Sequence, residues 1–387
     1  MTTQFFPYDQ LTWPEIDALP RHCPLVIPLG QGYNLDRLAS ALGEPPQAGL
    51  LPPIPYGWAG SKLRVDEGML GRLLKNLLDS LRDDGFSRVY ALTPQGLELG
   101  LGTEHISLFH LCQAAVPVPM SAEAWKDKVA LLPVGHTEQH ALHLPMSTDT
   151  LIIEAIAQGV AAADPGHVAL LPVMPYGVST HRPAFAGTLN CGGRAFEDFW
   201  LSVIDALVSR GCECIYIING HGGNHSFLVN AIKYAGERYP HAFIATSWLY
   251  LSGPQGAQAL QQHRSSGLGG MGHACELETA LILHLHPELV HMEKVVDEID
   301  FISTPSYYMD WNEGGALIAN PSWNDDTATG AYGAGSQATA EKGLLWLEAA
   351  IAEKVGHVGE ILSQQARRQA RRQAGYGLWG KNNQLSR

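Results

Sequence analysis

The chain has 387 residues, of which 45% are apolar and 16% are charged. These values fit a globular protein with a sizeable core and exclude a disordered chain. The formal net charge of −13 argues against a general nucleic-acid binder, because such proteins need basic surface to displace counterions from phosphates.

The N-terminal sequence, MTTQFFPYDQLTWPEID, lacks the basic segment and apolar run of a signal peptide. No run approaches the roughly 18 to 20 apolar residues that a membrane span needs. The six cysteines are scattered, and none of their spacings matches a CxxC zinc motif. We therefore expect a cytoplasmic protein with reduced thiols that binds neither membranes nor nucleic acids.

Three pairs of segments match each other in the same order along the chain, which indicates a duplication. The pairs are 24–35 with 129–140, 50–57 with 170–177, and 71–96 with 197–222. The clearest pair reads LLPPIPYG and LLPVMPYG. In the first pair, Pro28 aligns with Pro133 and Gly30 with Gly135.

Apolar, β-rich runs alternate with helical stretches along both copies, as in the strands expected at 129–134, 167–173 and 214–218. This alternation predicts a largely parallel sheet covered by helices on both faces. We expect a smaller N-terminal α/β domain (1–118), a second α/β domain (119–365) and a basic C-terminal tail (366–387). Sites on such sheets lie at the carboxyl ends of the strands.

The first copy lacks the polar side chains that the second carries at these strand ends. The replacements are Tyr33 for Glu138, Leu35 for His140 and Gln95 for His221. The N-terminal copy is therefore predicted to be a degenerate domain without metal ligands.

The segment GHTEQHALHLPMSTD (135–149) carries the first candidate ligands. Glu138 and His140 lie two residues apart after a buried strand, so an extended backbone places both side chains on one face. Asp149 follows at the turn into a helix. Two carboxylates and an imidazole suit a divalent metal, although a structural salt-bridge and capping cluster has the same composition.

Two further segments carry candidate residues. NGHGGN (219–224) places His221 at a strand's carboxyl end, where the glycines permit close approach of a ligand; a glycine-rich turn with an incidental histidine is the alternative. GGMGHACELETALILHLHPEL (269–289) places His273 before a helix with Glu276 and Glu278 in its first turn. Those carboxylates also complement a helix dipole.

Together these motifs resemble the successive signatures of the creatininase (creatinine amidohydrolase) family. The resemblance rests on GHTEQH…HLP…TD, NGHGGN and GHACELET, and covers about residues 124–360. PYGVSTHRPAFAGT (175–188) and TGAYGAGSQATAEKG (329–343) resemble two further family segments. The resemblance implies a three-layer α/β/α sandwich and a divalent metal centre, often binuclear, with zinc or manganese and with iron as a further candidate.

The resemblance also implies roles for individual residues. Glu138, Asp149 and His221 would hold one ion, and His140 with the shared Asp149 would hold a second. His273 looks like the proton shuttle for the leaving group. We assign catalytic roles to His273 and Glu278.

This chain departs from the family pattern at several positions. Creatinine-cleaving members carry a glutamate ligand where this chain has Gly223, and Glu278 is the expected replacement. His136 stands for the usual serine, and Ala141-Leu142 for the usual Gly-Pro. These departures argue against creatinine itself as the substrate.

Residues expected to contact substrate are His136, His181, Gly222 and Gly223. His143 and His225 are interpreted as structural histidines, with orientation of ligands as the alternative.

We therefore predict a metal-dependent hydrolase, with one or two ions per chain, in which an activated hydroxide opens a small cyclic amide or related cyclic carbonyl compound. The alternatives are hydrolysis of a carbon–carbon bond in a cyclic diketone derived from a sugar or cyclitol (3-dehydro-inosose-like), and a non-catalytic scaffold subunit. We expect a homo-oligomer.

Overall fold

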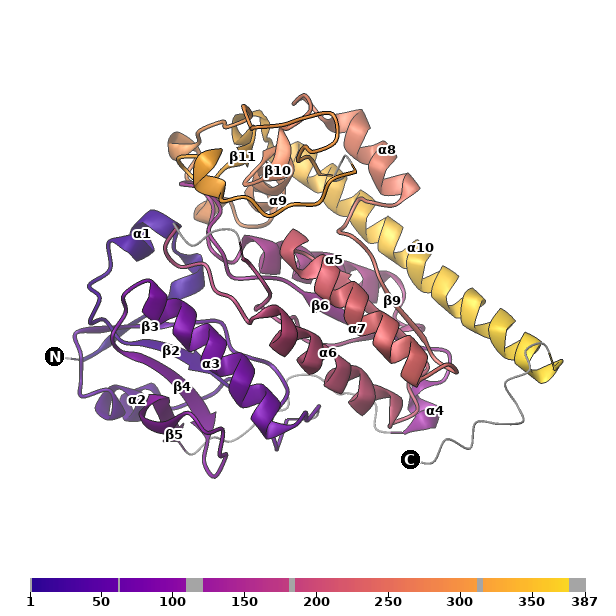
Figure 1. Cartoon of the computed structure of the whole chain (residues 1–387), viewed down its shortest axis with the longest axis horizontal. Helices are drawn as coiled ribbons and strands as arrows, with labels where there is room; N and C mark the ends of the chain where they lie inside the picture. Colours follow the sequence, from indigo (N-terminus) through magenta and orange to yellow (C-terminus); the bar gives the residue numbers. More distant parts are fainter. Residues whose placement is uncertain (1, 62, 109–120, 181–184, 312–315, 376–387) are drawn as a thin grey trace.

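The computed structural model describes residues 2–61, 63–108, 121–180, 185–311 and 316–375 (Figure 1). The N-terminal half contains a five-stranded sheet in which every pairing is parallel, in the order β1-β3-β2-β4-β5. Its strands are β1 (Gln4–Pro7), β2 (Leu25–Pro28), β3 (Gln47–Leu50), β4 (Val89–Pro94) and β5 (His105–Leu108). Its helices are α1 (Trp13–Asp17), α2 (Leu35–Ala41) and α3 (Glu67–Asp83).

The C-terminal half contains a four-stranded parallel sheet in the order β7-β6-β8-β9. Its strands are β6 (Val129–Val134), β7 (Val168–Leu170), β8 (Cys214–Asn219) and β9 (Phe243–Thr246). The helices around it are α4 (Ala122–Trp125), α5 (Thr148–Ala163), α6 (Gly193–Val208), α7 (His225–Arg238), α8 (Pro254–His263), α9 (Glu276–Leu285) and α10 (Ala340–Gln373). A short antiparallel pair, β10 (Met271–His273) and β11 (Tyr332–Gly333), lies beside α9 (Figure 1).

Short 3₁₀ turns link these elements. They are Tyr8–Gln10, Gly102–Glu104, Gly222–Asn224, Pro287–Leu289, Met292–Lys294, Trp323–Asp325 and Gly335–Gln337.

The two sheets share one topology. The order β3-β2-β4-β5 in the first matches β7-β6-β8-β9 in the second. The same backbone hydrogen bonds recur: the Gly30 N–H donates to the Ile54 carbonyl (2.9 Å), and the Gly135 N–H donates to the Met174 carbonyl (2.9 Å). This agreement supports the proposed duplication, with the aligned glycines in equivalent positions.

The two copies also end their long helices in the same way. Gly85 follows α3 with φ +91°, and Gly211 follows α6 with φ +86°. In both, the next residue donates its N–H back to the last turn, from Phe86 to the Leu81 carbonyl and from Cys212 to the Leu207 carbonyl. A left-handed glycine at this position closes a helix with little strain.

The halves share one core, in which α3 and α6 pack against each other between the two sheets (Figure 1). The ring of Tyr56, from the segment between β3 and α3, stacks on the ring of Phe199 in α6 with centroids 6.2 Å apart. On the far face of the second sheet, α5 and α10 pack against β6 and β8, and α9 packs on these two helices. The second sheet is thus sandwiched between helices on both faces.

The predicted α/β fold with mostly parallel sheets is confirmed. The proposed boundary at 118/119 falls outside the described residues, and the basic sequence predicted as a tail continues α10 as far as Gln373. The five described cysteines are free thiols, as expected. Within the described part of the chain, no helix is both long and apolar enough to cross a membrane.

Candidate metal centre

The candidate ligands gather where β6 and β8, neighbours in the second sheet, end. The connection from β6 leads outward to β7 and that from β8 leads outward to β9, so this is the point where the strand order reverses. Crevices at such points are the usual ligand sites of parallel sheets. The loop after β6 carries Glu138 and His140, α5 begins beside Asp149, and His221 follows β8.

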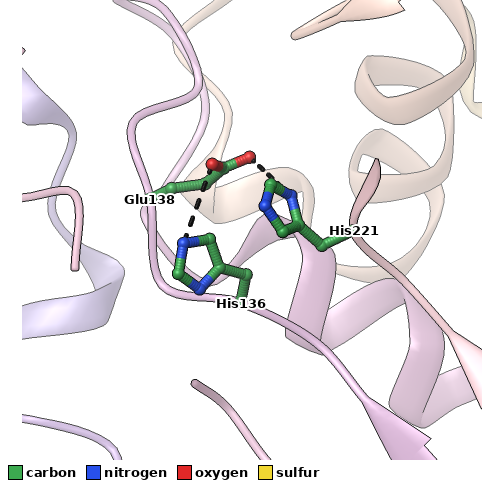
Figure 2. A group of neighbouring side chains, drawn as sticks. All are labelled: His136, Glu138 and His221. Atoms are coloured by element: carbon green, nitrogen blue, oxygen red, sulfur yellow. Dashed lines mark ion pairs between the residues drawn. The ribbon is translucent and has the colours of Figure 1, made fainter. Parts of the chain in front are cut away.

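His221 faces two carboxylates. Its Nδ1 atom lies 3.1 Å from Oε1 of Glu138 (Figure 2). The same atom lies 3.2 Å from Oδ2 of Asp149. Its other nitrogen, Nε2, donates to the main-chain carbonyl of Val178 at 3.0 Å. In the neutral ring this bond holds the proton on Nε2, so Nδ1 presents a lone pair to the carboxylates.

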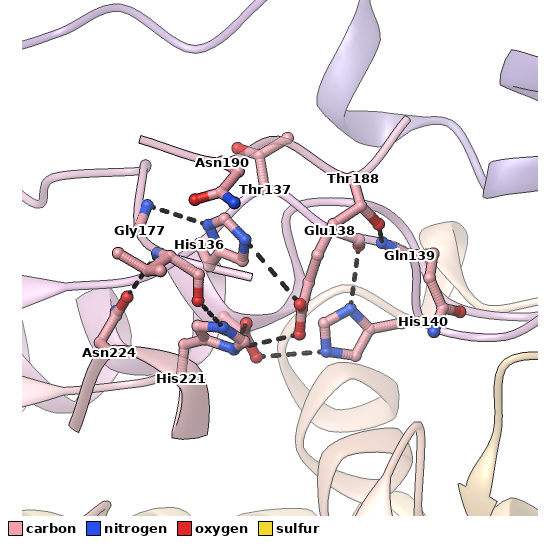
Figure 3. Close-up of polar contacts among 12 residues, drawn as sticks. His136, Thr137, Glu138, Gln139, His140, Gly177, Thr188, Asn190, His221 and Asn224 are labelled. Carbon is pink, nitrogen blue, oxygen red and sulfur yellow. Dashed lines mark hydrogen bonds and ion pairs between the residues drawn. The ribbon is translucent and has the colours of Figure 1, made fainter. Parts of the chain in front are cut away.

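The neutral His140 ring has the opposite tautomer from His221, and a backbone carbonyl orients it in the same way. Its Nδ1 donates to the main-chain carbonyl of Glu138 at 3.1 Å (Figure 3). Nε2 then carries the lone pair, 3.2 Å from Oδ1 of Asp149 and 3.9 Å from Oε1 of Glu278. Asp149 therefore lies between the two histidines, with one oxygen toward each.

The structure separates the roles of the two glutamates at the start of α9. Glu278 is buried; one oxygen accepts the Cys275 N–H, and the other faces His140. Glu276 points away and forms an ion pair with Lys342 while accepting the Ser265 N–H. Glu278 is therefore the glutamate placed to join a metal site.

His273 stands at the edge of this cluster. Its Nε2 donates to the main-chain carbonyl of Gln139 at 2.7 Å, which leaves Nδ1 3.6 Å from Oε1 of Glu138. The ring packs on His140, with centroids 4.2 Å apart. The residue that follows, Ala274, has φ +48°, a left-handed conformation that non-glycine residues adopt at a cost and that recurs at functional sites.

His136 lies behind Glu138 and is fully buried. The Gly177 N–H donates to its Nδ1 at 2.9 Å, so the neutral ring carries its proton on Nε2. That nitrogen faces Oε2 of Glu138 at 3.8 Å, and the His136 ring lies beside the His221 ring with centroids 4.4 Å apart (Figure 2). His136 is therefore placed to orient Glu138 or to join a metal site with Glu138 and His221, and the contact with substrate predicted from the sequence stays a prediction.

The donor set fits a divalent metal. Glu138, Asp149 and Glu278 are all buried, and no described lysine or arginine forms an ion pair with any of them. Three buried carboxylates this close together are costly unless positive charge lies among them. Each of the sets Glu138–His140–His273 and His140–Asp149–Glu278 has ligand atoms within 4.8 Å of one another and could hold an ion.

The pKa values of His221 and Glu278 also indicate that positive charge is needed at this centre. Burial alone would lower the pKa of His221, but Glu138 and Asp149 outweigh it and raise the pKa to about 9. Burial also raises the pKa of Glu278, reinforced by Asp149 and opposed by His140. A proton on the imidazole, or a metal ion, is needed where lone pairs face carboxylates.

The surroundings of Gly223 leave no room for the glutamate that creatinine-cleaving members carry at this position. A Cβ atom built there would lie 2.3 Å from the Val178 oxygen and 2.5 Å from Nε2 of His221. Any side chain at Gly223 therefore disturbs the hydrogen bond that orients His221. Glu278 approaches the site from α9 and avoids this conflict.

Sequence reasoning missed the residues that brace the ligands. Asn219 accepts the His221 N–H and donates to the His221 carbonyl, and Asn224 accepts the Val178 N–H at 2.9 Å (Figure 3). Gln139 fixes the next loop by accepting the Ala141 N–H and donating to the Gly330 carbonyl. The asparagines flank the NGHGGN histidine in the sequence, so their position was a usable signal.

A cavity of about 930 Å³ opens over the cluster. Glu138, Asp149, His221, His273 and Glu278 line it, together with Gly222 and Gly223, the two glycines predicted to contact substrate. Aromatic side chains form much of the remaining wall, namely Phe227, Trp248, Tyr307, Trp311 and Trp323. His181, a further predicted substrate contact, lies outside the described residues.

The two histidines interpreted as structural lie beside the cluster. His143 bonds to the Thr279 hydroxyl at 2.9 Å, and His225 packs edge-on against Trp248. His143 thus links the ligand loop to the helix that carries Glu278.

Comparison with known proteins identifies the family. The family model described as creatininase, creatinine amidohydrolase, matches residues 119–358. The chain belongs to the creatininase family. It is accordingly related to a family of metal-dependent hydrolases, as the sequence motifs had indicated.

Relatives of several activities resemble this chain. A mycofactocin precursor peptide peptidase of Mycobacterium ulcerans is 30% identical over 182 residues, which cover 43% of this chain and 61% of the relative. A creatinine amidohydrolase of Pseudomonas putida is 30% identical over 185 residues, 44% of this chain and 69% of the relative. A 3-dehydro-scyllo-inosose hydrolase of Thermotoga maritima is 29% identical over 199 residues, 49% of this chain and 60% of the relative. The matched region thus spans only about three fifths of the first and third relatives.

Solved creatininase structures share the fold. A manganese creatininase superposes with a TM-score of 0.51 and 26% identity, covering 62% of this chain and 92% of that one. A mutant creatininase of the Zn-Zn type gives a TM-score of 0.50 at 26% identity, with coverage of 62% and 92%.

Proposed function

We propose that this chain is a hydrolase that holds two divalent ions, zinc or manganese, and opens a small cyclic amide or a related cyclic carbonyl compound. One observation carries the proposal: two histidines, each fixed by a backbone carbonyl, present lone pairs to a buried set of three carboxylates. Glu138, Asp149 and His221 would hold one ion. His140, Asp149 and Glu278 would hold the other, with Asp149 shared.

The bound ions would supply a polarised carbonyl and a water molecule of lowered pKa. The protein's own residues would orient the metal ligands and transfer protons. The backbone bonds of His221 and His140 fix their ring orientations. His273, whose Nε2 donates to the Gln139 carbonyl, lines the cavity, and its Nδ1 would accept a proton and pass it to the leaving nitrogen.

The cavity supports a substrate with an apolar part. Trp248, Trp311 and Trp323 line it, and its volume of about 930 Å³ exceeds the needs of a single five-membered ring. Gly223, where creatinine-cleaving members carry a glutamate, also argues against creatinine itself. The same wide, aromatic cavity favours a second candidate, hydrolysis of a peptide amide, the bond class named for the mycobacterial relatives.

The test is turnover by protein loaded with zinc or with manganese, followed as the gain of one water in product mass. The panel holds lactams, imides, hydantoins, short peptides with aromatic residues, and cyclic diketones. We expect turnover among the amides, its loss in His273→Ala, and its retention in Glu276→Gln, which alters a buried glutamate that faces Lys342. Turnover of diketones alone would transfer the assignment to carbon–carbon hydrolysis. No turnover of any class at full metal loading would favour a non-catalytic scaffold.

A further inference from the structure

A second cavity, of about 970 Å³, lies at the carboxyl ends of β2 and β3 in the N-terminal half. The C-terminal half closes it, with the start of α5 and the loop after β7. Among the described residues, this cavity shares no lining residue with the cavity over the metal centre. Its volume lies within the range of small-molecule sites.

The cavity occupies the place in the first copy that the metal centre occupies in the second. Tyr33 and Leu35, which align with Glu138 and His140, both line it. The aligned Gly30 and Gly135 make matching backbone bonds, so the two loops leave their strands in the same way. The first half thus has a crevice at the equivalent end of its sheet, without the aligned candidate metal ligands.

The wall combines apolar surface with two carboxyl groups. Its apolar residues include Phe5, Phe6, Leu38, Leu50, Leu51 and Trp58. Asp9 contributes a carboxylate from the N-terminal half, and Glu154 contributes one from α5. Neither forms a salt bridge with a described lysine or arginine, although Gln158 hydrogen-bonds to Glu154 and the charge of His286 acts on it; burial raises the pKa of both carboxyl groups. Among the described lining residues there is no lysine or arginine, so a positively charged ligand would complement these carboxyl groups.

We propose that this crevice binds a small amphipathic amine, with its apolar body among the leucine and aromatic side chains and its ammonium group at Asp9 and Glu154. The apolar wall excludes a strongly hydrated cation such as a bare metal ion, and the two carboxylates disfavour an anion. The site is independent of the proposed hydrolysis, since it shares no residue with that cavity.

The test is calorimetric titration of the zinc-loaded full chain with octylamine, octanol and octanoate, which share a tail and differ in charge. We expect octylamine to bind with one-to-one stoichiometry, octanol to bind at least tenfold more weakly, and octanoate not to bind. In the double variant Asp9→Asn/Glu154→Gln, the affinity for octylamine should fall to that for octanol. Octanoate binding as tightly as octylamine, or octylamine binding unchanged in the double variant, would overturn the proposal.

Two further variants serve as controls. Leu35→Trp tests whether octylamine binds in this cavity, and Lys62→Ala tests whether that lysine contributes to binding. Leu35→Trp fills the rim at a residue that is 44% exposed, so it should abolish binding of both octylamine and octanol while the melting temperature is kept. Unchanged binding in Leu35→Trp would place the amine elsewhere and refute the site. Lys62 lies between the lining residues Ser61 and Leu63, outside the described residues. Lys62→Ala should retain octylamine binding, and its loss there would contradict the charge argument.

Discussion

The imidazole of His221 and the carboxylate of Glu138 face each other, with Nδ1 3.1 Å from Oε1, while the opposite side of the ring donates to the Val178 carbonyl. In the neutral ring, a lone pair thus points at a carboxylate oxygen. Two acceptors approach this closely only when a proton or a metal ion lies between them. Because His140 repeats the arrangement toward Asp149, the centre requires positive charge at two places.

The first prediction concerns the backbone that orients His221. Gly223→Ala should disrupt the bond from Nε2 to the Val178 carbonyl, because the new Cβ would meet both atoms at 2.5 Å or less. Metal content should fall by about one ion per chain, as measured by elemental analysis. Gly222→Ala is the matched control, since a Cβ there meets only Trp248 at 3.6 Å. Equal metal content in the two variants would refute this account of Gly223.

A second prediction separates proton transfer from metal binding. His273→Ala should retain both ions and lose turnover by about 10²-fold or more, the usual contribution of a positioned general acid or base. Metal content and kcat would be measured on the same preparation. Loss of an ion in this variant would instead make His273 a ligand, through the set that it forms with Glu138 and His140.

The third prediction uses Asp84, whose side chain accepts the Gly187 N–H from the other half at 2.7 Å. Burial raises the pKa of Asp84 to about 6. A carboxyl group with a raised pKa in the folded state favours folding at low pH, and this contribution disappears as the pH rises from about 4 to 6. Asp84→Asn should flatten the free energy of unfolding across that window and raise it at pH 7 by up to about 3 kcal/mol.

Urea denaturation at several pH values measures this effect, with Asp83→Asn at the exposed neighbouring position as the control. An unchanged pH profile in Asp84→Asn would contradict the assignment of the shift to this group.

The fourth prediction concerns the core shared by the two halves. Phe199 of α6 is fully buried and packs against Tyr56 of the N-terminal half. Phe199→Ala should lower the free energy of unfolding by roughly 3 to 5 kcal/mol, through lost burial and a residual cavity. Both halves should still unfold in one transition. Tyr234→Ala, at a side chain that is 58% exposed, should change stability by no more than about 0.5 kcal/mol. Two separate transitions in the parent protein would contradict a shared core.

The sequence could predict that the candidate ligands lie close together, because their spacing follows from the strands. Glu138 and His140 come directly after a buried strand, and His221 comes after its neighbour, so a parallel sheet brings them together. The duplicated LLP…PYG segments likewise predicted two sheets, whose matching strand orders agree with that reading.

The rest depends on contacts that leave no trace in local sequence. The carbonyls of Val178 and Gln139 orient His221 and His273, and any residue type supplies a carbonyl. Glu276 and Glu278 both lie in the first turn of a helix, so the sequence alone does not tell which one faces the site. In the structure Lys342 of α10 forms an ion pair with Glu276. The cavity of about 970 Å³ is lined by residues of both halves, so it depends on how the halves pack and is not predicted by any one sequence segment.

The most direct measurement is metal content per chain across a set of matched variants. The parent protein should bind two ions, and Glu138→Ala, Asp149→Ala and His221→Ala should each lose most of the metal, because a lost ligand leaves neighbouring carboxylates uncompensated. Glu278→Gln should keep one ion, whereas Glu276→Gln should keep both, since Glu276 faces Lys342. Full metal content in the Glu138, Asp149 and His221 variants, or loss of an ion in Glu276→Gln but not in Glu278→Gln, would contradict this assignment of the centre.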